Sequence, residues 1–196
     1  MVGGRRERSI PPDYFERLFS ERGDPWDFET SSYEAAKYDH TLAALPRDRY
    51  ADALEVGCAN GVLTARLAPR CDRLLALDVS PTALAAARAR CADLPHVAFE
   101  RRRMPTEAPG GTFDLILLSE VVYYLDGDDI ARLAAWLAAA VRSRGHLLLV
   151  HWTGETDYPR SGDDAVRELA ECLGDAAQPL RADRREGYRL DLWVRR

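Results

Sequence analysis

The sequence predicts a doubly wound α/β fold, in which helices cover both faces of a mainly parallel sheet. Strand-like and helix-like segments alternate through most of the 196 residues. The segments LLALD, DLILLS and HLLLVH are unbroken apolar runs, a pattern typical of strands that are buried on both faces. No internal repeat or linker interrupts the alternation, so residues 11–196 are expected to form one domain.

The first part of this domain, residues 11–46, is expected to form a helical cap. One helix begins at two prolines, which suit a first turn, and ends near Gly23. A second helix over 32–45 starts at capping serines and ends before Pro46. Its expected core-facing residues are Ala35, Tyr38, Leu42 and Leu45, and its expected polar face comprises Tyr33, Lys37, His40 and Thr41.

The α/β core is expected over residues 47–196, and residues 1–10, with Gly-Gly and mixed charge, are expected to be disordered. The tail alternates apolar and polar residues from Tyr188 to Val194, which favours a late antiparallel strand. The other predicted strands are 53–57, 73–78, 97–100, 113–118 and 145–151, and the predicted core helices are 61–69, 81–92, 128–141 and 162–173.

Composition excludes several classes of function. The net charge of −5 argues against a general nucleic-acid binder. No apolar stretch reaches the about 20 residues of a membrane helix, and no apolar segment follows the basic start, so neither a membrane span nor a secretory signal is expected. The cysteines lack metal-ligand spacing, which favours buried free thiols in a reducing, cytoplasmic compartment and no metal site. These cysteines are Cys58, Cys71, Cys91 and Cys172.

The segment DALEVGCANGVL, residues 52–63, runs from an apolar strand into a turn with two glycines. Gly57 permits a tight turn, and Gly61 lets the next helix start close to strand and ligand. The spacing G-x-x-x-G, with Ala59 in the middle, departs from the G-x-G-x-x-G of dinucleotide sites. Asp78 ends the next predicted strand, about 20 residues on, where a carboxylate can bind ribose hydroxyls. The pattern predicts an adenosine-containing ligand and leaves a nicotinamide dinucleotide open.

Two further segments place polar and aromatic residues after predicted strands. One buried strand leads directly into Ser119, Glu120 and the tyrosines at 123 and 124. Residues 151–163, HWTGETDYPRSGD, follow another strand and form a loop of a size typical of a lid or an acceptor wall. Ligands of doubly wound sheets bind beyond the carboxyl ends of the strands. A reactive centre is therefore expected near these residues.

The segments LEVGCANG, LLALD and FDLILLSEVVYYL resemble motifs of class I S-adenosylmethionine (SAM)-dependent methyltransferases, which have a Rossmann-like sheet. A closer resemblance, to the nodulation-type (NodS-like) N-methyltransferases, covers nearly the whole chain and rests on DPWDFETSSYEAAKYDHTLAALP, LAPRCDRLLALDVS and HWTGETDYPRSGD. It implies SAM as methyl donor, S-adenosylhomocysteine as product and N-methylation of a small-molecule amine. The named member of that group methylates the free amine of a deacetylated chitin oligosaccharide, so amino sugars and oligosaccharides are expected acceptors.

The resemblance also implies cofactor contacts. Glu55, with the two glycines of the turn, is expected to shape the methionine end, and Asp78 to hold the ribose. Arg103 and Met104 are expected to flank adenine, although methyltransferases often have an aspartate there. The remaining contacts expected in these loops are Cys58, Ala59, Val79 and Ser119.

The helical cap is expected to contribute as well. The rings of Trp26 and Tyr33 are expected to border the cofactor, because an aromatic face tolerates a sulfonium cation. Lys37, the only lysine among 27 basic residues, is expected to neutralise the methionine carboxylate.

An amine attacks only when it is neutral, so a proton acceptor helps its methylation. The candidate acceptors are Glu120, His151 and Asp157, and the alternative is that they only position the substrate while the proton leaves to water. Aromatic residues that can stack on sugar faces are Tyr124, Trp152 and Tyr158, with Trp26. The alternatives to N-methylation are O-methylation, a nicotinamide-dependent oxidoreductase and a catalytically silent SAM-fold binding protein. The sequence leaves the oligomeric state open.

Overall fold

The computed structural model describes residues 4–196, and the chain divides into two compact units. Unit 1 comprises residues 4–10 and Met104–Arg196, and unit 2 comprises Pro11–Arg103. The predicted helical cap therefore shares a unit with the first strands of the predicted core. The single-domain organisation expected over residues 11–196 stays a prediction.

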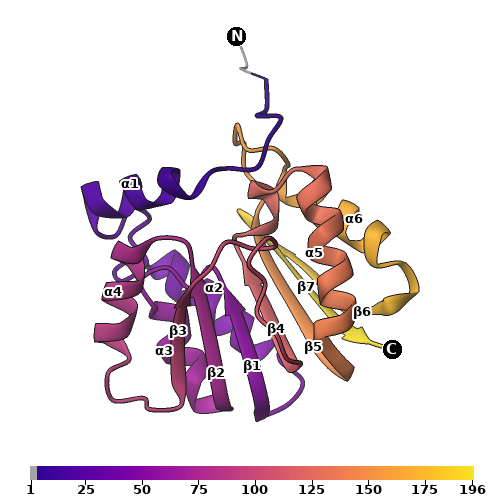
Figure 1. Cartoon of the computed structure of the whole chain (residues 1–196), viewed down its shortest axis with the longest axis horizontal. Coiled ribbons are helices and arrows are strands. Elements are labelled where there is room, and N and C mark those ends of the chain that lie inside the picture. Colours follow the sequence, from indigo (N-terminus) through magenta and orange to yellow (C-terminus); the bar gives the residue numbers. More distant parts are fainter. Residues whose placement is uncertain (1–3) are drawn as a thin grey trace. The chain divides into compact units, whose positions relative to one another are not determined.

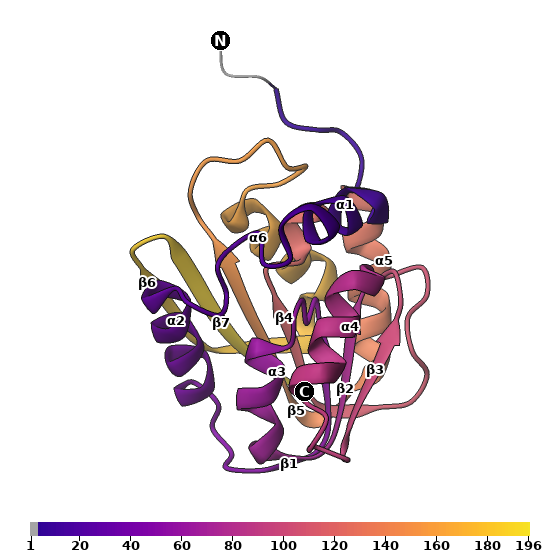
Figure 2. The same cartoon turned by 90° about the vertical axis from the view of Figure 1, so that its left-hand side faces the viewer.

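Unit 2 is a parallel sheet with its helices. Its elements are α1 (Pro12–Arg22), α2 (Ser32–Ala43), β1 (Tyr50–Val56), α3 (Val62–Leu67), η1 (Ala68–Arg70), β2 (Cys71–Asp78), α4 (Pro81–Arg90) and β3 (Val97–Arg101). The strands pair in the order β3-β2-β1, all parallel (Figure 1). α4 packs on β2 and β3, α3 lies beside α4, and α2 lies beside α3 (Figure 2). All strands and helices predicted for this part of the chain are confirmed.

Local signals explain where these helices begin and end. Ser31 precedes α2, and its Oγ accepts a hydrogen bond from Glu34 N at 3.3 Å. Ser80 caps α4 in the same way, accepting from Ala83 N at 3.0 Å. α1 ends at Gly23, whose φ of +70° suits glycine. The capping positions that the sequence predicted are therefore the ones the chain uses.

The faces of α2 differ from the prediction. Ala35, expected to face the core, is exposed, whereas Lys37 and Thr41 of the expected polar face are only 3% and 1% exposed. Their polar groups are satisfied inside the helix, because Lys37 Nζ donates to Glu34 Oε1 at 2.9 Å and Thr41 Oγ1 donates to Lys37 O at 2.7 Å. Tyr38 is buried as predicted.

Unit 1 contains the other strands. Its elements are β4 (Phe113–Ser119), η2 (Val122–Tyr124), α5 (Gly127–Ala140), β5 (Val141–Trp152), α6 (Gly162–Leu173), η3 (Gly174–Ala176), β6 (Ala177–Arg185) and β7 (Tyr188–Arg195). The strand order is β4-β5-β7-β6. β4 and β5 are parallel, and β7 runs antiparallel to both of its neighbours. α5 and α6 pack side by side (Figure 1).

β7 confirms the predicted late antiparallel strand, but β6 has no counterpart in the prediction. β6 is an edge strand whose residues are mostly exposed, and it contains Pro179. Proline and charged side chains are typical of edge strands, and they remove the apolar alternation by which strands are recognised.

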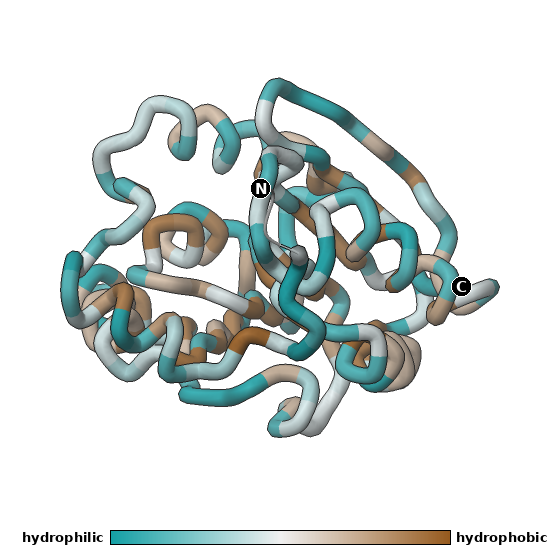
Figure 3. The backbone as a smooth tube through the Cα atoms, turned by 90° about the horizontal axis from the view of Figure 1, so that it is seen from above, coloured by the Kyte–Doolittle hydropathy of each residue, from teal (hydrophilic) through white to brown (hydrophobic). Residues whose placement is uncertain are grey.

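The N-terminal segment was expected to be disordered over residues 1–10. Residues 1–3 lie outside the described residues, and the stretch that follows is hydrophilic (Figure 3). This stretch nevertheless makes main-chain hydrogen bonds within unit 1: Arg6 N donates to Asp157 O and Ile10 N to Tyr124 O, each at 2.9 Å. The described part of the segment is therefore held against the rest of unit 1.

Three of the cysteines, Cys58, Cys71 and Cys91, are free and buried as predicted, but Cys172 is exposed. The prediction for Cys172 was wrong because the buried face of α6 is formed by Val166, Leu169 and their neighbours, and Cys172 falls outside it. Among residues 4–196, no helix has the length and apolar character needed to cross a membrane.

Candidate functional site

The turn after β1 has the backbone of a tight bend. Gly57 and Gly61 have φ values of +80°, and Ala59 between them has a φ of +50°. Gly57 N and Cys58 N both donate to Leu77 O of β2, at 2.8 and 2.9 Å, so the bend is tied to the neighbouring strand. These main-chain bonds hold the start of the bend in place.

Gly61 has a second reason to be glycine. A Cβ at this position would lie 2.8 Å from Ala87 Cα, so α4 passes directly against the bend. Only a residue without a side chain permits both the positive φ and this approach. The predicted role of Gly61, to let the next helix start close to its neighbours, has this physical basis.

Asp78 ends β2, and its carboxylate points back to the bend. Asp78 Oδ2 accepts from Ala59 N and Oδ1 accepts from Ser80 N, both at 2.9 Å. Burial raises the pKa of Asp78 above its usual value, and the N–H groups of Ser80 and Ala59 oppose that rise. Each oxygen accepts one main-chain bond, and a carboxylate has about four acceptor positions, so both oxygens retain a lone pair.

Glu55 lies on β1 and is 1% exposed. Burial raises its pKa to about 7, although the hydroxyl of Thr64, which donates to Glu55 Oε2 at 2.6 Å, acts in the opposite direction. The nearby charge of Asp78 also contributes to the rise. Glu55 is therefore a buried carboxyl that takes up a proton near neutral pH.

Asn60 also belongs to the bend, and the sequence analysis did not select it. It is 1% exposed, and its Oδ1 has no hydrogen-bond partner within residues 4–196. Its main-chain oxygen accepts from Arg90 Nε at 3.0 Å, and Arg90 in turn pairs with Glu29. A buried amide oxygen without a donor indicates a position for a ligand donor. Its place between two glycines of the motif was the one signal available in the sequence.

Glu16 on α1 is a second residue that sequence reasoning missed. Its carboxylate accepts hydrogen bonds from the hydroxyls of Ser80 and Thr82, each at 2.6 Å. These two hydroxyls hold the pKa of Glu16 below its usual value. Because Ser80 also donates its N–H to Asp78, Glu16 supports the turn that orients the Asp78 carboxylate.

The residues of the helical cap that are expected to contact the cofactor make contacts within the protein. Lys37 forms its ion pair with Glu34 of the same helix and lies 5.5 Å from the ring centroid of Tyr33. Trp26 packs against Phe19 at a centroid distance of 5.6 Å, and Tyr33 is 37% exposed. The charge of the single lysine is thus balanced within the protein, which the sequence analysis did not foresee.

The residues expected near adenine fall into different units. Arg103 is the exposed last residue of unit 2, and Met104, which is buried, begins this part of unit 1. Val79 O accepts from Arg101 Nε at 3.1 Å, so Arg101 is the arginine that contacts the turn after β2. Cys58 is buried, and burial raises the pKa of its thiol well above its usual value.

In unit 1, Glu120 follows Ser119 at the end of β4. Its φ of +57° is rare for a residue with a side chain. Glu120 Oε2 accepts from the Tyr123 hydroxyl at 2.6 Å and from Trp152 N at 2.8 Å. Burial raises the pKa of Tyr123 well above its usual value, so this hydroxyl keeps its proton and stays a donor. The backbone and both donors together fix the carboxylate.

The other two predicted proton acceptors are engaged by the protein. His151 is fully buried, and its Nε2 lies 3.1 Å from Val122 N, which donates to it. Asp157 is exposed and forms an ion pair with Arg6 at 3.0 Å. All three candidates thus have partners, and Glu120 differs from the other two in being half-buried at the end of a strand.

The tyrosine that donates to Glu120, Tyr123, belongs to a cluster of three tyrosines. Tyr123 stacks on Tyr158 with ring centroids 5.4 Å apart, and Tyr124 meets Tyr158 edge-on at 4.7 Å. The ring of His151 lies 5.4 Å from that of Tyr123. Unit 1 thus brings together most of the predicted acceptor-side residues in one cluster.

Trp152 stands beside this cluster with its indole 40% exposed. The indole occupies the space that a Cβ at position 154 would need, so the absence of a side chain at Gly154 makes room for it. Its main-chain N–H is the one that donates to Glu120. Trp152 therefore combines a fixed, exposed aromatic face with a direct link to the carboxylate.

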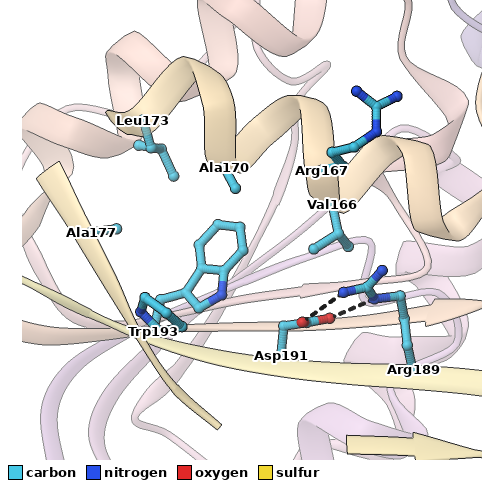
Figure 4. Close-up of a pocket in the computed structure, with 9 residues that line it drawn as sticks. Val166, Arg167, Ala170, Leu173, Ala177, Arg189, Asp191 and Trp193 are labelled. Carbon is cyan, nitrogen blue, oxygen red and sulfur yellow. Dashed lines mark hydrogen bonds and ion pairs between the residues drawn. The ribbon is translucent and has the colours of Figure 1, made fainter. Parts of the chain in front are cut away.

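A separate groove of about 230 Å³ lies between α6 and the strands β6 and β7 (Figure 4). Its walls are mainly apolar, with Val166 and Leu173 on the helix and Trp193 on β7. Its charged residues are Arg167, Arg189 and Asp191, and the last two pair with each other at 2.7 Å (Figure 4). No predicted site residue lines this groove, so it is distinct from the candidate site.

Comparisons with known proteins agree with this architecture. A family model described as Nodulation protein S (NodS) matches residues 13–149. The Nodulation protein S of Bradyrhizobium diazoefficiens is 41% identical over 103 residues, which cover 52% of this chain and 49% of the relative. That of Sinorhizobium fredii is 35% identical over 130 residues, covering 64% of this chain and 59% of the relative. The chain thus spans about half the length of these curated relatives.

Two solved structures are similar over most of the chain. One, from Pseudomonas syringae and provisionally assigned as a methyltransferase, is 42% identical with a TM-score of 0.74, covering 84% of this chain and 100% of that one. The other, the N-methyltransferase NodS from Bradyrhizobium japonicum WM9 in complex with S-adenosylhomocysteine, is 23% identical with a TM-score of 0.79, covering 93% and 97%. They confirm the predicted Rossmann-like α/β methyltransferase fold. Because the family model matches well over half of its residues, the chain belongs to the NodS family.

Proposed function

We propose that this chain is a SAM-dependent methyltransferase that N-methylates an amine of a small acceptor, with amino sugars and oligosaccharides as the favoured class. Membership of the NodS family supports the proposal. The observation that carries it is the carboxylate of Asp78, held between Ala59 N and Ser80 N at the end of β2. A carboxylate oriented in this way suits the two hydroxyls of an adenosine ribose.

The residues present fit this cofactor. Both oxygens of Asp78 retain acceptor capacity for ribose hydroxyls. Asn60 Oδ1 and the carboxyl of Glu55 are buried acceptors in and next to the bend, suited to the amino group of a methionine moiety. Gly61 lies so close to Ala87 that no side chain fits at this position of the bend. When bound, SAM supplies an activated methyl group on a sulfonium.

The protein has to present a neutral amine and exclude water. An amine with a lysine-like pKa near about 10.4 is mostly protonated at neutral pH, so it must lose a proton before it attacks. We assign the receiving group to Glu120, since its carboxylate is oriented by Tyr123 and Trp152. His151 is a positioning residue in this scheme, because its Nε2 accepts from Val122 N. Asp157 belongs to the loop and pairs with Arg6.

The acceptor side also favours a sugar. A pyranose ring binds through its apolar face to an exposed aromatic ring, and its amino group binds to a carboxylate. Trp152 offers the exposed ring, Glu120 offers the carboxylate, and Tyr124 and Tyr158 extend the aromatic surface. The combination supports an amino sugar over a simple alkylamine.

The proposal is tested by incubating the protein with methyl-labelled SAM and a panel of amino sugars, chitin oligosaccharides with one free amine, alkylamines and phenols. Mass spectrometry then locates the label. Label on an amine, strongest for amino sugars, is the expected result. Label on phenols alone would show an O-methyltransferase. Calorimetric binding of NAD but not of S-adenosylhomocysteine would favour an oxidoreductase, and cofactor binding without any label transfer would leave a silent binding protein.

A further inference from the structure

The N-terminal strap, defined as residues 5–10, runs along two segments of unit 1. One is the loop between β5 and α6, and the other is the turn η2 (Figure 1). Arg6 N donates to Asp157 O and Ile10 N donates to Tyr124 O, both at 2.9 Å. Ile10 is also 6% exposed. The strap therefore adds main-chain hydrogen bonds to two segments that carry predicted acceptor residues.

Ser9 fastens the strap near the start of α5. Its Oγ donates to Asp129 Oδ2 at 2.5 Å and accepts from Asp126 N at 2.9 Å, and Ser9 N donates to Asp126 Oδ2 at 3.1 Å. Asp129 is only 4% exposed, so its bond to the serine hydroxyl is shielded from water. A bond to a buried charged group contributes more than one at the surface.

Arg5 and Arg6 contact the loop itself. Arg5 Nη1 donates to Tyr158 O at 3.1 Å, and Arg6 Nε pairs with Asp157 at 3.0 Å. The side chains of this ion pair are 43% and 56% exposed, so the pair alone stabilises the loop weakly. The loop is also held by the main-chain bond from Arg6 N to Asp157 O, three residues before the Ser9 anchor in the strap.

The contacts continue from the strap to Glu120. The strap holds Tyr124 and Tyr158 by their main-chain oxygens. The rings of these residues pack together, and Tyr158 stacks on Tyr123. The hydroxyl of Tyr123 then donates to Glu120. A path of hydrogen bonds and ring contacts within unit 1 thus joins the strap to the candidate proton acceptor.

We propose that the N-terminal strap is a positioning element for the methyl acceptor: by holding Tyr124 and Tyr158 it keeps Glu120 in place to meet the acceptor amine. This inference rests on the proposed function. It assigns to residues 5–10 a role in acceptor binding and none in cofactor binding, since the partners of their hydrogen bonds, Asp157, Tyr124 and Asp126, are not among the residues expected to bind the cofactor.

The test compares four variants of the full chain. Ser9→Ala removes the hydroxyl that fastens the strap, and Ser9→Thr keeps it. Arg6→Ala removes the contact with Asp157, and Arg8→Ala is its matched control, because Arg8 is exposed and its side chain makes no hydrogen bond or ion pair within residues 4–196. Hydrogen–deuterium exchange of residues 153–160 is measured without acceptor, and acceptor KM, kcat and S-adenosylhomocysteine affinity are measured in parallel.

For Ser9→Ala we expect loop exchange and acceptor KM to rise about fivefold, the factor that corresponds to one hydrogen bond. Arg6→Ala should show a smaller rise in both quantities, and Ser9→Thr should keep both at their wild-type values. Arg8→Ala should change neither quantity. The affinity for S-adenosylhomocysteine should be the same in all four variants. Unchanged loop exchange or unchanged acceptor KM in Ser9→Ala, or an equal rise in Arg8→Ala, would overturn the role of the strap. If Ser9→Ala shows faster hydrogen–deuterium exchange of the loop but the protein methylates no amine, the strap is supported as the element that holds the loop. The proposed function is then overturned instead.

Discussion

Each unit has a carboxylate at the end of a buried strand, but the two carboxylates are held in different ways. Asp78 is held by the main-chain N–H groups of Ala59 and Ser80, next to a bend made of small residues. Glu120 is held by the hydroxyl of Tyr123 and by Trp152 N, within a group of aromatic rings. The donors of the first arrangement are all backbone groups, whereas the second combines a side-chain hydroxyl with a backbone N–H.

The difference matches the two tasks we propose. A cofactor shared by a whole enzyme class can be bound by backbone geometry, which many sequences can form. An acceptor that is specific to one enzyme has to be recognised by side chains on loops, where changes are tolerated. The comparison predicts that substitutions in the bend affect stability and cofactor binding, and that substitutions at Glu120 affect only the acceptor step.

The largest effect is expected for Gly61→Ala in the bend. The new Cβ would lie 2.8 Å from Ala87 Cα, on a backbone with a φ of +80°. Strain and overpacking together should lower the free energy of unfolding by about 4 kcal/mol. Gly110→Ala is the control, because a Cβ there meets nothing within 4 Å, and it should change stability by less than about 0.5 kcal/mol. Urea denaturation measures both, and equal midpoints would show that the bend tolerates side chains.

The second-largest effect is expected on the pH dependence of the free energy of unfolding, through the buried carboxyl of Glu55. Its pKa in the folded chain is about 7, against an ordinary 4.5, so the folded state binds the proton more tightly than the unfolded state. The stability it contributes is fully present below about pH 4.5 and is lost as pH rises through 7, by about 3 kcal/mol. Glu55→Gln keeps the shape without the titration. Its unfolding free energy should fall less than that of the wild type between pH 5 and 8, and parallel profiles would contradict the assignment.

A smaller effect, confined to the acceptor step, is expected for Glu120→Gln. Losing the proton acceptor should lower kcat/KM for the amine about 100-fold, equivalent to about 2.7 kcal/mol, while the affinity for S-adenosylhomocysteine stays the same. Glu155→Gln, an exposed position in the loop after β5, is the control and should keep full activity. If steady-state kinetics show Glu120→Gln to be as active as this control, the proton leaves to water.

The smallest effect is expected for Asp78→Asn. An amide keeps the size but loses the charge that favours ribose hydroxyls, so calorimetry should show S-adenosylhomocysteine binding weakened by at least about 1.5 kcal/mol. Asp93→Asn, on an exposed position of the same unit, should bind as the wild type does. Equal affinities for the two variants would remove Asp78 from the cofactor site.

The sequence was sufficient for features that depend on neighbouring residues. Apolar runs located the buried strands, serines located the starts of α2 and α4, and the glycines located the bend. The features it missed depend on partners that are distant in the chain or on an edge position. Glu16 meets Ser80 across 64 positions, and Ser9 meets Asp126 across 117. β6 shows no apolar alternation because most of its residues are exposed.

The sequence predicted which residues belong to the acceptor side, but not which partners each of them has. The sequence placed Glu120, His151 and Asp157 together as candidates, and only the structure separates them by their partners. As the only lysine, Lys37 is expected to meet a cofactor carboxylate, and nothing in the residue pattern indicates that Glu34 balances its charge. Such pairings depend on side-chain geometry that periodicity does not encode.

The indole of Trp152 fills the space that any side chain at Gly154 would require. A single methyl group at 154 would therefore displace the ring of the residue whose main-chain N–H donates to Glu120. For protein engineering this makes the two positions inseparable: loops exchanged between relatives to alter the acceptor must transfer the tryptophan and the glycine as one block, whereas exposed positions such as Glu155 are open to variation.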